Sequence, residues 1–308
     1  MPVPMATARS TLRTLLWLLL VCFAVPAADA AGLDDARALY EGQRYAEAQA
    51  LLEELADREP GNAAVHHYLG RLARKRQDLA AAVEHLKTAR DLAPDDPAII
   101  FDYGATSSLY AENQGTSLRA AMAARNGRAA LERAVELAPD NLDYRQALLE
   151  FYAYAPGIVG GSVRKAYEQA DAIAARDERR GTYARGNLLV QEKRYPEALA
   201  VWRELRDAHP DDYWVLFQLG RTLAQSGGDP AEGIAALQQC LELPRPEGAP
   251  GPSRVNWNLG KLHRDRGDIE EARAAFRAAL LIEPLNTEIA TDLARLPNPA
   301  PAEKPAEK

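Results

Sequence analysis

The feature that most constrains the fold of this chain is a pattern that recurs along most of its length. Four segments begin with an apolar residue, two spacers and an alanine, and each of them ends at a proline fifteen residues after its start. They start at Tyr45, Leu79, Tyr195 and Ile269 and end at Pro60, Pro94, Pro210 and Pro284. The first two prolines are 34 residues apart. A fixed period of this size is typical of a solenoid, in which each unit packs only against its neighbours.

The composition favours helices within these units. Of the 308 residues, 47% are hydrophobic and 26% are charged, which is the balance of an ordinary folded chain. Alanine, leucine, arginine and glutamate are frequent, only 7% of the residues are aromatic, and no segment shows the alternation of a strand. The net charge of −7 argues against nucleic-acid binding, because phosphate contacts need a basic surface. The sequence therefore predicts an all-α fold.

The residues inside the best units identify a family. In one unit, Leu69 and Gly70 are followed by Ala82, Leu86 and Ala89 before the closing proline. Another unit repeats the spacing with the residues Leu259, Gly260, Ala272, Phe276, Ala279 and Pro284. These patterns resemble the tetratricopeptide repeat, and the chain is similar to secreted bacterial proteins of that family over nearly all of its mature length. The resemblance implies an α-solenoid of about seven helix-turn-helix units.

We place the units at residues 31–62, 63–96, 97–141, 142–178, 179–212, 213–252 and 253–286. Residues 287–296 are predicted to form a terminal helix that covers the last apolar edge, so that the superhelical domain spans 31–296. The tail, residues 297–308, is rich in Pro, Ala, Glu and Lys and is predicted to be disordered. Three units carry extra residues, within 112–127, at 155–161 and at 244–252, and insertions in solenoids map to loops.

Residues 1–30 have the pattern of a secretory signal peptide. Arg9 and Arg13 precede an apolar run over residues 15–25, and Ala28 and Ala30 form a cleavage site of the A-x-A kind. Cleavage after Ala30 would release a periplasmic or secreted protein. The alternative is an uncleaved membrane anchor, although an apolar run of 11 residues is short for a span.

The sequence offers little for catalysis. His66 and His67 are adjacent and would point about 100° apart on a helix, which is poor geometry for chelation. Cys240 aligns with small buried alanines of other units, so we interpret it as a buried structural thiol. No serine elbow or H-E-x-x-H motif is present. We therefore expect no enzyme activity, no metal and no cofactor.

The resemblance implies that the first helices line a concave groove that binds a peptide. The positions facing the groove in the C-terminal half are aromatic, amide or basic. The candidate binding residues are Tyr183, Asn187, Trp214, Phe217, Arg221, Arg254, Trp257 and Lys261. Such a row suits an extended peptide with acidic residues or a free C-terminus. The competing interpretation is that the aromatic rings pack between neighbouring repeats and that the basic residues are solvated.

Two functions follow from this reading. The first is an exported scaffold or adaptor that binds a protein or peptide in its groove. The second is a non-catalytic subunit of an envelope transport, export or assembly machine, tethered to the inner membrane if the N-terminal segment is retained. Membrane contact is expected only in that second case, and no nucleic acid is expected in either.

Overall fold

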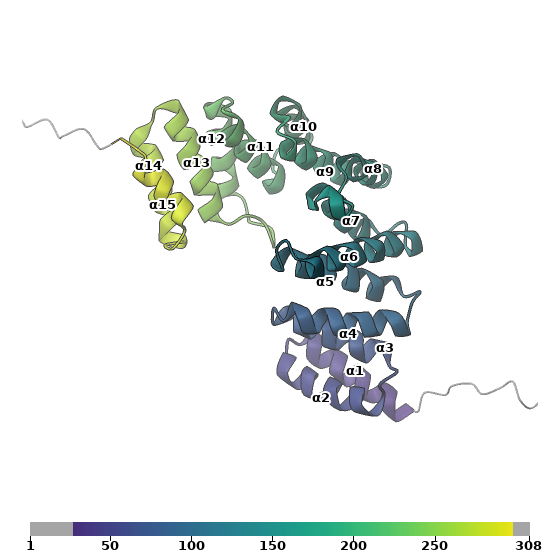
Figure 1. The fold of residues 1–308 in the computed structure, drawn as a ribbon. Helices are drawn as coiled ribbons and strands as arrows, with labels where there is room; N and C mark the ends of the chain where they lie inside the picture. The colour runs from purple at the N-terminus through teal and green to yellow at the C-terminus, as the bar shows by residue number, and fades with distance from the viewer. Residues whose placement is uncertain (1–26, 298–308) are drawn as a thin grey trace, which may run out of the picture. The chain divides into compact units, whose positions relative to one another are not determined.

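The structure is a computed structural model that describes residues 27–297, with side chains from residue 32 onward. The predicted tail, apart from Pro297, and the predicted signal segment, apart from its last four residues, lie outside this range. Within it, the chain forms fifteen α-helices and one 3-10 turn and contains no strand (Figure 1). In residues 27–297, no helix combines the length and the apolar composition that a bilayer span requires.

The helices follow one another in antiparallel pairs joined by short turns. They are α1 (Ala27–Glu41), α2 (Tyr45–Arg58), α3 (Ala63–Lys75), α4 (Leu79–Leu92), α5 (Pro97–Asn113), α6 (Leu118–Leu137), α7 (Leu142–Tyr154), α8 (Val163–Ala174), α9 (Glu178–Gln191), α10 (Tyr195–Ala208), α11 (Tyr213–Ser226), α12 (Pro230–Glu242), α13 (Pro252–Arg266), α14 (Ile269–Ile282) and α15 (Thr287–Ala294). Each predicted unit contains one pair, and α15 is the predicted terminal helix. The prediction of an all-α solenoid of seven units is confirmed.

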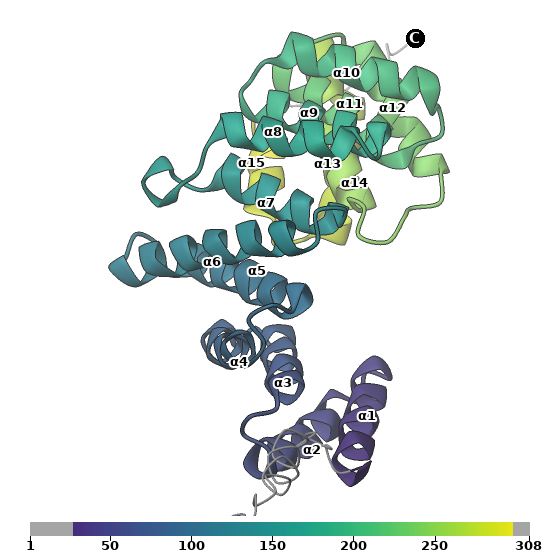
Figure 2. The same ribbon diagram turned by 90° about the vertical axis from the view of Figure 1, so that its right-hand side faces the viewer.

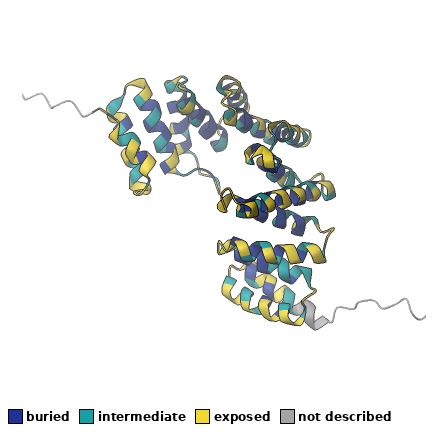
Figure 3. Ribbon diagram, in the orientation of Figure 1, coloured by how far each residue is buried: buried dark blue, intermediate teal, exposed yellow. Residues whose placement is uncertain are grey.

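The chain divides into two compact units, residues 1–130 and 131–308. In the first, α1 to α4 stack in chain order, and α5 packs against α4 (Figure 2). In the second, α7 to α15 stack in the same way, each helix against the next. Within each unit the helices bury the stripe that faces their neighbours and expose the rest (Figure 3). No helix could bury its apolar stripe alone, which is why the stack is the stable form.

The glycine of the Leu-Gly motif sets the distance between the two helices of a pair. A Cβ atom added to Gly260 would lie 2.5 Å from the Phe276 ring, and one added to Gly220 would lie 2.4 Å from Leu237 Cγ. The same close approach joins Gly70 to Leu86. Real Cβ atoms do not approach other atoms so closely, so the first helix carries glycine where the second carries its largest apolar side chain.

Polar residues fix where the helices begin. Several first helices are preceded by Asn or Asp, whose side-chain oxygen accepts hydrogen bonds from free backbone N–H groups of the first turn. These caps are Asn62, Asp96, Asn141, Asp212 and Asn286. Asp96 and Asp212 are therefore N-terminal caps of their helices.

The turn inside a pair requires one residue with left-handed backbone. Gly227 and Gly267 occupy it in two pairs, whereas Gln43, Gln77 and Lys193 adopt φ near 60° at the same place in others. A side chain costs energy in this conformation, yet it lets the turn carry a functional group that glycine cannot.

The extra residues of the third unit form helix rather than a loop. The helices α5 and α6 have 17 and 20 residues, whereas most of the others have 12 to 15. The expectation that this insertion maps to a loop is therefore wrong. Residues 118–137 are rich in alanine, arginine and leucine, which favours extension of the helix over a loop.

The other two insertions are loops. Residues 155–161 contain the 3-10 turn η1 (Gly157–Val159), in which Val159 is buried and Ile158 is 81% exposed. Residues 244–252 are held by a hydrogen bond of 2.6 Å that the Tyr213 hydroxyl donates to the Pro250 carbonyl, and Ala249 is buried there.

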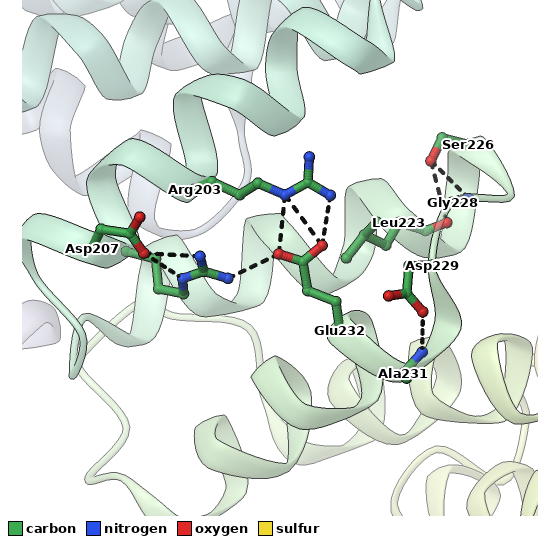
Figure 4. A network of polar contacts seen from close by, with 9 residues as sticks. Arg203, Asp207, Leu223, Ser226, Gly228, Asp229, Ala231 and Glu232 are labelled. Atoms are coloured by element: carbon green, nitrogen blue, oxygen red, sulfur yellow. Dashed lines mark hydrogen bonds and ion pairs between the residues drawn. The ribbon is translucent and has the colours of Figure 1, made fainter.

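The second helices are also joined by charged groups. Arg203 on α10 donates three hydrogen bonds, of 3.0, 3.2 and 2.6 Å, to the two oxygens of Glu232 on α12, and Arg206 donates a fourth of 2.8 Å (Figure 4). The hydrogen bond from Arg203 is the largest cause that lowers the pKa of Glu232. This network joins α12 to α10.

Replacing Gly260 by leucine should therefore destabilise the protein. The new side chain overlaps the Phe276 ring and forces α13 away from α14, which we expect to cost about 1–3 kcal/mol of unfolding free energy. Urea unfolding followed by circular dichroism measures the change. Gly61→Leu is the matched control, because nothing lies within 4 Å of a Cβ atom there. Equal stability of the two variants would contradict the packing argument.

Candidate functional site

One cavity in the second compact unit gathers three of the predicted binding residues. It has a volume of about 630 Å³. It is lined by Tyr154, Asn187, Val190, Gln191, Lys193, Tyr195, Arg221, Ala224, Gln225, Lys261, Arg264 and Asp292. Asn187, Arg221 and Lys261 stand at equivalent positions on α9, α11 and α13, each one residue after the motif glycine or its equivalent. The repeat register thus brings them to one surface, which we call the basic cavity.

The charges of the lining are mostly positive. Lys193, Arg221, Lys261 and Arg264 contribute four cations, and Asp292 contributes a single carboxylate. None of the ion pairs within the described residues involves Arg221 or Lys193. The cavity is therefore locally basic in a chain of net charge −7. A concave surface with this sign attracts anionic groups.

A network of neutral hydrogen bonds holds one wall of the cavity. Gln218 is buried, and its Nε2 donates to the Tyr183 hydroxyl at 3.0 Å and to Asn187 Oδ1 at 2.8 Å. Arg221 Nη1 donates to Gln218 Oε1 at 3.3 Å. The Tyr183 ring also packs edge-on against Trp202, with centroids 5.2 Å apart, and burial raises the pKa of its hydroxyl. These contacts fix the orientation of Asn187 and Arg221.

A charged cluster forms the opposite wall. Lys261 Nζ lies 3.6 Å from the centroid of the Trp257 ring, and the Trp257 indole nitrogen donates a hydrogen bond of 2.8 Å to Asp292 Oδ2. Asp292 lies on α15 and also approaches Lys261 at 4.0 Å and Arg264 at 3.8 Å. Burial is the largest cause of a lowered pKa at Lys261, although the charge of Asp292 acts in the opposite direction.

The remaining candidates lie outside the cavity lining. Arg254 stacks over the Trp257 ring at 5.7 Å and extends the charged wall. Trp214 is half-buried and packs against the core of the second compact unit. Phe217 is only 3% exposed and belongs to that core, so the expectation that its ring faces the groove is corrected. The physical reason is that an apolar ring at this position gains more from contact with its neighbours than from water.

The sequence reasoning missed several residues of the cavity. Lys193 reaches it from the left-handed turn between α9 and α10, and Tyr154 reaches it from the end of α7. Asp292 is not among the predicted residues, because the predicted groove positions are aromatic, amide or basic. Its signal was present: Asp292 follows Trp257 by 35 residues, as Asp102 follows His67.

The first compact unit contains a similar charged cluster around Asp102 on α5. His67 Nε2 donates a hydrogen bond of 2.7 Å to Asp102, and Arg71 and Arg74 approach the same carboxylate at 3.7 and 3.6 Å. Burial would raise the pKa of Asp102, but the hydrogen bond from His67 and the nearby Arg74 and Arg71 guanidinium groups hold it below its usual value. His67, Arg71 and Arg74 of α3 therefore already share one carboxylate.

Comparison with known proteins assigns the family. Two tetratricopeptide repeat models match the chain, one over residues 33–97 and 218–286 and the other over residues 179–222. Together they cover more than half of it. The chain belongs to the tetratricopeptide repeat family, as the Leu-Gly, Ala and Pro spacing predicts. Repeat scaffolds of this kind are generally non-catalytic and typically bind protein partners.

Two solved structures share the fold. The chain is similar to a tetratricopeptide repeat protein from Parabacteroides merdae, with a TM-score of 0.67, 14% identity and coverage of 87% of this chain and 98% of the other. It is also similar to the C-terminal part of a repeat-containing protein from Cytophaga hutchinsonii, with a TM-score of 0.53, 16% identity and coverage of 85% and 99%. At these identities the likeness concerns the fold alone.

A curated relative is similar over a shorter stretch. Cellulose synthase operon protein C from Pseudomonas fluorescens is 33% identical over 111 residues, which are 35% of this chain. The match spans only 8% of the length of that relative.

The thiol of Cys240 lies apart from the basic cavity and should be unreactive. Cys240 is 2% exposed, and burial raises its pKa to about 12. Because the thiolate is the reactive form, native protein at pH 8 should be alkylated by iodoacetamide at Cys240 far more slowly than protein unfolded in urea. Mass spectrometry of the peptide that contains Cys240 measures the two rates. Equal rates would contradict the burial.

Proposed function

We propose that this protein is an exported, non-catalytic scaffold that binds an acidic segment of a partner protein in the basic cavity. The observation that carries the proposal is the convergence of Asn187, Arg221 and Lys261 on one cavity with four cations and a single carboxylate. An extended peptide is the natural ligand of such a surface, because its carboxylates can pair with arginine and lysine while its backbone contacts the amides.

The walls of the cavity support binding rather than catalysis. Asn187 is oriented by a partly buried hydrogen bond of 2.8 Å and Arg221 by a longer one of 3.3 Å, so less side-chain entropy is lost when a ligand binds. Tyr154 and Tyr195 add aromatic contact area beside the charges. A partner that combines acidic residues with an apolar one fits this lining, and a free C-terminal carboxylate is a second source of the same charge.

Reversing the charge of Arg221 should weaken this binding. In Arg221→Glu, we expect the affinity for a hexaglutamate peptide to fall about tenfold or more, because one charge-assisted hydrogen bond is lost and a repulsion is added. The melting temperature should change little, since Arg221 is half-buried and makes one long hydrogen bond of 3.3 Å. Isothermal titration calorimetry at fixed salt measures the affinity.

Arg277→Glu on α14 is the matched control, because Arg277 is exposed on a second helix and lies outside the cavity lining. It produces the same change in net charge and should leave binding unchanged. Wild-type affinity in both Arg221→Glu and Lys261→Glu would contradict the proposed site and direct attention to the loop at residues 155–161.

Export rests on the signal-like pattern of residues 1–30. We expect the mature protein, purified from the cells that produce it, to begin at Ala31, because small residues at positions 28 and 30 suit signal peptidase. N-terminal sequencing of the native protein measures this directly. Retention of residues 1–30 would contradict cleavage and favour a membrane-tethered form.

A second candidate function is a non-catalytic subunit of a larger envelope assembly. The similarity to cellulose synthase operon protein C over 111 residues favours it, since that relative is far longer and is named for an operon of a synthetic machine. Purification of the native protein under mild conditions distinguishes the candidates. A subunit should elute in a stable complex of fixed stoichiometry, whereas an adaptor should elute largely alone.

A further inference from the structure

Contacts between successive first helices follow one rule in four places. A residue on one first helix contacts the residue 31 positions later on the next. The four pairs are Arg37 with Tyr68, Arg71 with Asp102, Asn187 with Gln218, and Lys261 with Asp292. We call the second member of each pair the clasp residue. Three clasp residues are also hydrogen-bonded to the residue 35 positions before them. Asp102 and Asp292 accept from His67 and Trp257, whereas Gln218 donates to the Tyr183 hydroxyl.

The clasp residues differ in charge, and the difference decides which basic groups already lie beside a carboxylate. Asp102 lies among His67, Arg71 and Arg74, and Asp292 lies among Trp257, Lys261 and Arg264. The clasp residue between α9 and α11 is instead the neutral Gln218. Arg221, which contacts Gln218, therefore keeps an unmatched positive charge at the cavity.

Both clasp residues at the cavity are held in place. The Nε2 group of Gln218 donates to Tyr183 and to Asn187, so its Oε1 atom is the one left facing Arg221. The Asp292 side chain is 13% exposed, and the hydrogen bond from Trp257 fixes it on the cavity wall. Neither group can turn away without the loss of a partly buried hydrogen bond.

We propose that Gln218 and Asp292 determine how strongly the cavity binds acidic segments. The neutral Gln218 leaves Arg221 available to a partner carboxylate, whereas Asp292 lies beside Lys261 as an internal competitor. Arg264 is paired with Asp265 at 3.0 Å and approaches Asp292 at 3.8 Å. This inference rests on the proposed function, because it specifies how an acidic partner divides its contacts within the same cavity. Arg221 is then the principal anchor, and Lys261 contributes only as far as Asp292 is displaced.

Two isosteric substitutions test the inference in opposite directions. Asp292→Asn keeps an oxygen that accepts from Trp257 but removes the competing charge, so the affinity for hexaglutamate should rise about tenfold. Gln218→Glu supplies Arg221 with an internal carboxylate, so the affinity should fall by about the same factor. Isothermal titration calorimetry at fixed salt measures both, with hexaglutamine as the neutral peptide.

Matched controls separate a local effect from a change in net charge. Glu271→Gln on α14 and Gln238→Glu on α12 make the same changes at exposed positions outside the cavity lining, and both should bind hexaglutamate like the wild type. If Gln218→Glu melts at a much lower temperature, Asp292→Asn decides the question alone, because its hydrogen-bond acceptor is preserved.

The outcomes distinguish this inference from the proposed function. Opposite shifts in the two clasp variants with silent controls support it, as does hexaglutamate binding that appears only in Asp292→Asn. Loss of binding in Arg221→Glu with wild-type affinity in both clasp variants overturns the inference and leaves the proposed function standing. Equal shifts in the clasp variants and their controls overturn it as well. Absence of hexaglutamate binding in the wild type and in Asp292→Asn overturns both proposals.

Discussion

The close approach of the two helices within each repeat is the constraint on which the rest of the structure depends. In four repeats a glycine on the first helix faces a large apolar side chain of the second: Gly70 faces Leu86, Gly186 faces Trp202, Gly220 faces Leu237 and Gly260 faces Phe276. This contact fixes the separation and rotation of the pair, and so determines which residues of the first helix face away from the second. The residue after the glycine is Arg221 or Lys261. It lines the basic cavity because the glycine before it faces the second helix of the pair.

Successive repeats are then joined by different chemistry on their two faces. Second helices α10 and α12 are joined by the Arg203–Glu232 ion pair, whereas first helices are joined through the clasp residues. Exposed ion pairs contribute little to stability individually. The apolar stripe therefore supplies most of the stability, and the polar contacts determine the register. A consequence is that the charge of a clasp residue can change while the helices remain stacked. The charge at that position can therefore vary with the ligand that the groove binds.

Much of this fold could be predicted from the sequence, because the same spacing of small and large apolar residues, which packs two helices together, occurs in several repeats. Seven helix pairs and the terminal helix α15 lie where the spacing of Leu-Gly, Ala and Pro places them. The prediction that the insertion near residues 112–127 forms a loop was wrong. The repeat spacing shows that residues are added, but it does not show whether they extend a helix. For the site, the repeat register predicted that Asn187, Arg221 and Lys261 share one surface, and they line one cavity.

The limits of that prediction have a physical cause as well. Whether Phe217 faces the groove or the core depends on a rotation of one helix by a fraction of a turn, which the spacing of motifs does not define. The charge of the cavity likewise depends on contacts between repeats. Within a single repeat, Arg221 and Lys261 occupy equivalent positions and both predict an available positive charge. They differ because the next first helix supplies Asp292 to Lys261. Arg221 contacts the neutral Gln218, which the preceding first helix holds through Tyr183 and Asn187. In a solenoid, the property of a groove residue therefore belongs to a pair of neighbouring repeats rather than to one.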